Sequence, residues 1–66
     1  MNKMRYAAVK TLGNDEHILK WFESKDEAII FGRDYFNGMQ PGDGVITIEG
    51  IRDGDPQHRI VSGWHF

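Results

Sequence analysis

The residue types that most often carry out chemistry are present in this chain of 66 residues, but their spacing does not assemble a catalytic or metal site. His17, His58 and His65 are the candidate zinc ligands, because the chain has no cysteine to supply a thiolate. No two of these histidines stand two or four residues apart, the spacings that bring ligands together on one strand or helix face. We therefore predict surface histidines and no bound metal.

Two short motifs resemble ligand-binding loops. Asp53-Gly54-Asp55 begins like a calcium loop, but the following residues lack the further oxygen ligands and the closing glutamate that calcium requires. Gly42 and Gly44 are reminiscent of a phosphate cradle, yet they follow a predicted helix and precede a predicted strand, which is the reverse of the required order. Both motifs are typical of turns.

Nucleophilic catalysis finds no support either. Ser24 is expected to cap a helix, and Ser62 is expected to point into the core. The carboxylates fall mainly in turns and at the helix start, so no pair is placed for acid–base work. We predict that the chain is not an enzyme and has no cofactor, and a metal-assisted enzyme is the least favoured hypothesis.

Length and composition indicate one small folded domain spanning residues 1–66. Hydrophobic residues make up 39% and charged residues 27%, and their patterning is that of a folded chain. The absence of cysteine excludes disulfides and favours the cytoplasm. No apolar run approaches the roughly 20 residues of a membrane span, and no signal peptide is apparent. The net charge of −2 gives no general attraction to nucleic acid or anionic lipid.

The elements that would position these residues are four strands and a helix. The strands are predicted at residues 4–12, 17–23, 45–51 and 59–66, and the helix at residues 25–37. A capping box, in which Ser24 and Glu27 bond each other's backbone, marks the helix start. The first two strands are predicted to join through a loop of about four residues, and Asn37-Gly38 offers a positive φ to end the helix.

The fold class is therefore α+β, with the order β-β-α-β-β. Placing the third strand beside the first gives the sheet order 2-1-3-4, in which every neighbouring pair is antiparallel; the alternative, third beside second, needs a parallel pair. The helix covers one face of the sheet. Its apolar stripe contains Gly32, which would let the helix backbone lie close to the strands, and Ile30 falls on its solvent side.

Strict alternation along each strand divides the residues between two faces. The predicted helix-side residues are Ala7, Val9, Leu19, Trp21, Ile46, Ile48, Ile60, Trp64 and Phe66. The predicted residues of the opposite, uncovered face are Tyr6, Ala8, Lys10, Ile18, Lys20, Phe22, Val45, Thr47, Glu49, Arg59, Val61 and His65. We expect alanine at Ile48, Trp21 or Phe31 to unfold most of the protein.

The uncovered face is apolar and locally positive, and it carries the functional hypotheses. The favoured one is a non-catalytic protein-interaction or assembly module, with a homodimer formed face to face or edge to edge as its simplest form. The predicted contact residues are Tyr6, Ile18, Lys20, Phe22 and Arg59. The alternative is a binder of single-stranded nucleic acid, with bases stacked on Tyr6 and Phe22. A third possibility is that these apolar residues are merely exposed.

Overall fold

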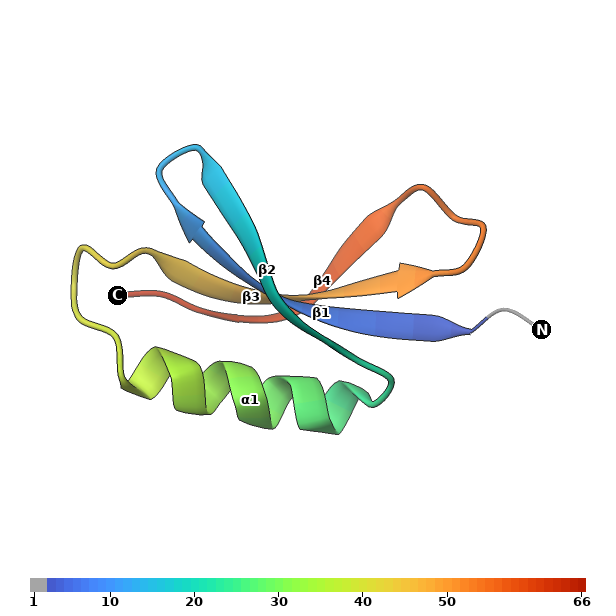
Figure 1. Ribbon diagram of the computed structural model, residues 1–66, viewed down its shortest axis with the longest axis horizontal. Helices are drawn as coiled ribbons and strands as arrows, with labels where there is room; N and C mark the ends of the chain where they lie inside the picture. Colours follow the sequence, from blue (N-terminus) through green and yellow to red (C-terminus); the bar gives the residue numbers. More distant parts are fainter. Residues whose placement is uncertain (1–2) are drawn as a thin grey trace.

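The computed structural model describes residues 3–66, which form four strands and one helix (Figure 1). The elements are β1 (Met4–Leu12), β2 (Asp15–Phe22), α1 (Lys25–Asn37), β3 (Val45–Arg52) and β4 (His58–Trp64). The strands make an antiparallel sheet in the order β2-β1-β3-β4, and α1 packs on one face of it. The α+β class, the element order and the strand order predicted from the sequence are confirmed.

The β1–β2 hairpin is tighter than predicted. Only Gly13 and Asn14 lie between the strands, so the loop has two residues in place of four, and β2 begins at Asp15. Gly13 adopts φ +63°, a conformation that glycine reaches without steric cost, while Asn14 keeps a negative φ. This pattern matches the turns that join strands of right-handed twist.

Helix α1 has the predicted bounds, with one of the two hydrogen bonds of the predicted capping box at its start and a different C-terminal cap. The Ser24 hydroxyl accepts a hydrogen bond from the Glu27 backbone N–H at 3.4 Å, and Asp26 and Glu27 lie in the first turn, where negative charge suits the helix dipole. At the other end Gly38 has φ −89°, so the predicted positive φ is wrong. Its N–H instead donates to the Tyr35 carbonyl at 3.1 Å, which tightens the last turn.

The helix approaches the sheet closely because small residues line the contact. Ala28 and Gly32 are the buried residues of α1, and Ala28 packs with Ala8 and Ile48 in the core. A Cβ atom on Gly32 would stand 2.6 Å from Trp64 Cζ3 and 2.9 Å from Ile48 Cδ1. The sequence-based expectation of a close approach at Gly32 is confirmed, and Ile30 is exposed as predicted.

Each edge strand contains one extra residue that the sequence pattern did not disclose. Opposite the adjacent residues Ala8 and Val9 of β1, β2 supplies Lys20 and Ile18, so Leu19 is unpaired in the register. On the other side of the sheet, Ile48 and Glu49 face Ser62 and Ile60, which leaves Val61 as the extra residue. Such bulges interrupt the alternation of side chains and increase the local twist.

The predicted division of the two faces is therefore wrong over much of the sheet. Tyr6, Phe22 and Val61, assigned to the uncovered face, pack against the core formed with α1. The register of β1 against β3 explains part of the error, because Ala8 pairs with Ile48 and shares its helix-side position. The bulges explain the rest. Four residues assigned to the helix side lie on the opposite face instead: Ala7, Val9, Trp21 and Ile60.

Among the described residues, no helix has the length and apolar character needed to cross a bilayer.

Candidate functional site

Figure 1 shows α1 on one side of the sheet and no other described element over the opposite side, which we call the open face. By strand register it consists of Arg5, Ala7, Val9, Thr11, Glu16, Ile18, Trp21, Val45, Thr47, Glu49, Ile51, His58 and Ile60. Its apolar members include Trp21 at 43% exposure and Ile60 at 71%. An antiparallel sheet normally presents polar side chains on a solvent face, so this composition is unusual.

A groove runs into the open face between the two hairpins. In Figure 1 the tips of the β1–β2 and β3–β4 hairpins rise on the side opposite α1, so the sheet is concave there. Ala7 and Val9 of the central strand β1 form the apolar floor, with Ile18 of β2 and Ile51 of β3 beside them. Its volume is about 190 Å³. Although no helix covers them, Ala7 and Val9 are only 1% and 3% exposed, so neighbouring groups of the sheet already cover most of their surface.

The polar lining of the groove consists of Glu16, Glu49 and His58. Glu49 comes from the third strand and its side chain is only 18% exposed, whereas His58 is half-exposed on the neighbouring strand. The His58 Nδ1 lies 3.1 Å from Glu49 Oε1, which is hydrogen-bonding distance. This contact fixes a carboxylate beside an apolar floor. No Lys or Arg lines the groove among the described residues.

Arg5 is the basic residue of the open face, and its side chain contacts Trp21 and Asp53. Its guanidinium carbon lies 5.0 Å from the ring centroid of Trp21, and its Nε lies 3.7 Å from Asp53 Oδ1. The stacked pair forms a rim at one end of the open face, where Arg5 pairs in register with Ile51. The groove therefore has a negative lining, and the Arg5 guanidinium and the Trp21 ring lie together at the rim of the open face.

The five predicted contact residues do not share a surface. Ile18 is exposed on the open face as predicted. Tyr6 and Phe22 pack against the core, and Phe22 contacts Phe31 of α1 at a centroid separation of 5.3 Å. The Lys20 ammonium lies 5.4 Å from the Phe22 ring, at the junction of helix and sheet. The aromatic and basic platform proposed for nucleic acid is consequently not formed on the open face.

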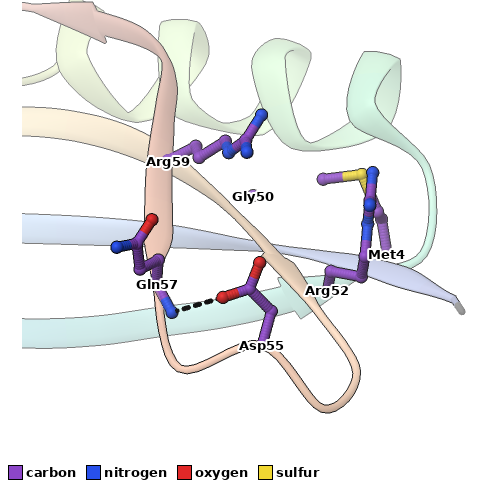
Figure 2. A pocket seen from close by; sticks show the side chains of 6 residues that line it. All are labelled: Met4, Gly50, Arg52, Asp55, Gln57 and Arg59. Carbon is purple, nitrogen blue, oxygen red and sulfur yellow. Dashed lines mark hydrogen bonds between the residues drawn. The ribbon is translucent and has the colours of Figure 1, made fainter.

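Arg59, the fifth predicted residue, lies on the helix side of the β3–β4 hairpin. Figure 2 shows it beside Gly50, its partner in register, together with Arg52 and Met4. The hollow that they line has a volume of about 50 Å³, which suits little more than solvent. The Asp55 carboxylate at its edge accepts from the Gln57 backbone N–H at 2.9 Å, so it serves the turn.

The turn interpretations of the loop motifs agree with the structure. The Asp55 N–H donates to the Arg52 carbonyl at 3.0 Å, closing the turn that contains Asp53-Gly54-Asp55. Gly42 and Gly44 both adopt positive φ between α1 and β3. His17 and His58 lie on the opposite edge strands β2 and β4. Within residues 3–66, no group of three or more His, Asp or Glu side chains is arranged to hold a metal.

Sequence reasoning placed Ile18 and Glu49 of the groove on the uncovered face but missed other residues of the open face. Ala7 and Val9 of the groove and the neighbouring Trp21 were assigned to the helix side, and His58 was treated only as a possible metal ligand. The available signal was the small size of Ala8, Ala28 and Gly32, which together permit a close contact between helix and sheet and so place Ala8 under the helix. The residue types of β2 and β4 do not indicate where the bulges lie.

Comparison of the chain with protein-family models, curated protein sequences and solved structures finds no match. Function must therefore be argued from the geometry of the chain itself.

Proposed function

We propose that this chain is a non-catalytic protein-interaction module that binds its partner through the open face. The observation that supports this function is a concave sheet surface bearing exposed apolar side chains, Ile18, Trp21 and Ile60, around a groove. Large apolar side chains exposed together on one face of a small protein often mark an interaction site. A chain with few buried large side chains also gains stability from association.

The open face is a better contact surface than either sheet edge. Association through an edge requires an uninterrupted row of unpaired backbone groups. Both edge strands carry a bulge, at Leu19 in β2 and at Val61 in β4, which bends the strand and breaks that row. A partner that covers the groove would instead bury Trp21 and Ile60 without needing a regular edge.

Site-specific photo-crosslinking tests the proposal. A photoreactive phenylalanine analogue replaces Ile60 on the open face and, in a matched control, Ile30, which is equally an isoleucine but lies on the solvent side of α1. We expect a discrete protein adduct from position 60 in cells that contain the native partners, and none from position 30. Equal adduct yields at the two positions, or no adduct at position 60, would refute the function. Mass spectrometry of the adduct distinguishes a second copy of the chain from another protein.

A further inference from the structure

The size of the groove restricts what can occupy it. Pockets that enclose a small-molecule ligand usually have volumes of about 300–1,000 Å³. The groove, at about 190 Å³, is smaller than that range, and it is open on the side away from α1. Its dimensions suit one or two side chains projecting from a larger partner.

The shape disfavours a second copy docked face to face. In Figure 1 both hairpin tips rise on the side of the sheet away from α1, so two open faces pressed together would touch at their hairpins and leave the groove of each copy unfilled. Empty apolar space forfeits the contacts that stabilise an interface. A narrow, convex segment enters the groove between the hairpins, where Ile18 and Ile51 offer accessible apolar walls.

The charge of the groove selects the chemistry of that segment. Glu16 and Glu49 bring two carboxylates to an apolar groove, and Glu49 lies at hydrogen-bonding distance from the ring of His58. Arg5 does not offset them, because it stacks on Trp21 and pairs with Asp53. A carboxylate that is largely withdrawn from water attracts a cation more strongly than an exposed one does.

We propose that the groove receives an arginine side chain from an apolar segment of a partner protein. This inference rests on the proposed function. Arginine combines an apolar stem with a charged head, so its methylene groups suit Ile18 and Ile51 while its guanidinium meets Glu49, and Glu16 adds a second negative charge to the groove. Its planar fork bonds a carboxylate through two hydrogen bonds and is more weakly hydrated than the lysine ammonium.

A peptide titration followed by two-dimensional NMR tests the chemistry directly. The probe is acetyl-Leu-Arg-Leu-amide, and the matched control replaces its arginine by citrulline, which has the same shape without the charge. We expect the arginine peptide to shift the amide resonances of Ala7, Val9 and Ile51. The citrulline peptide should bind at least about tenfold more weakly, as loss of a charged hydrogen bond does. Equal affinity for the two peptides, shifts confined to other elements, or no shifts would overturn the inference.

Groove variants separate this inference from the function on which it rests. Glu49→Gln and the more exposed Glu16→Gln should each lower arginine-peptide affinity and the adduct yield from position 60, whereas Glu23→Gln, outside the groove, should change neither. Using two groove variants guards against misfolding of one, which circular dichroism would report. Adducts that survive both groove substitutions would refute the arginine site and leave the open face as an interface. An adduct made of two copies of this chain would overturn the assignment to a partner protein.

Discussion

Gly32→Ala inserts one methyl group where α1 lies closest to the sheet. The new carbon would stand 2.6 Å and 3.1 Å from two atoms of the Trp64 ring and 2.9 Å from Ile48 Cδ1, so the ring or the helix must shift. Overpacking of this kind costs about 1–3 kcal/mol. The intrinsic helix preference for alanine over glycine returns about 1 kcal/mol. The net expectation is a loss of about 1 kcal/mol.

The measurement is urea unfolding followed by far-ultraviolet circular dichroism, supported by a thermal melt. For a domain of this size, 1 kcal/mol corresponds to a fall in Tm of about 4–8 °C. Gly38→Ala is the matched control, because Gly38 has φ −89° and its nearest neighbour to a new Cβ is the Tyr35 carbonyl oxygen at 3.6 Å. We expect that variant to be unchanged or more stable by up to about 1 kcal/mol. If Gly32→Ala proves as stable as Gly38→Ala, the close helix–sheet contact is wrong.

Three further substitutions test other parts of the fold. Ile48→Ala empties a fully buried site and should lower the free energy of unfolding by about 2–5 kcal/mol. The control Ile30→Ala, at an exposed position, should lower it by about 0.5 kcal/mol or less, and similar urea unfolding curves for the two variants would contradict the burial of Ile48. Gly44→Ala should lower Tm more than Gly42→Ala, since both have positive φ but only Gly44 abuts the end of β1; equal losses would contradict that contact. Ser24→Ala should cost about 1 kcal/mol through loss of the helix cap, and an unaltered melt would disprove the cap.

The features of the fold that depend on local pattern were predictable. The capping residues Ser24 and Glu27 fix the start of α1, and chain order with antiparallel pairing yields the sheet order. The faces of the edge strands β2 and β4 were not predictable by alternation, because one extra residue reverses every side chain beyond it. Ile18 and Trp21 therefore share the open face although they stand three residues apart.

The candidate site was less predictable than the fold, because bulges reverse the faces within β2 and β4 and because the alternation of β1, which pairs with β3 without a bulge, was assigned to the wrong face. Of the five predicted contact residues, Ile18 lies on the open face, while Tyr6 and Phe22 pack toward α1. The sequence of a strand does not show whether an aromatic side chain packs against the helix of the same chain or remains exposed for a partner. We therefore expect Trp21→Ala to destabilise the protein less than the sequence indicated, because Trp21 is partly exposed and contacts Arg5 rather than the helix.

The bulges at Leu19 and Val61 have a consequence for the behaviour of the protein at high concentration. A flat sheet of this size with regular margins would recruit further strands and grow without limit into fibrils. Kinks near the middle of both margins leave only short regular stretches for an incoming strand. Excising Leu19 would straighten one margin, and the shortened chain should then form fibrils that bind amyloid dyes at concentrations where the parent chain stays dispersed.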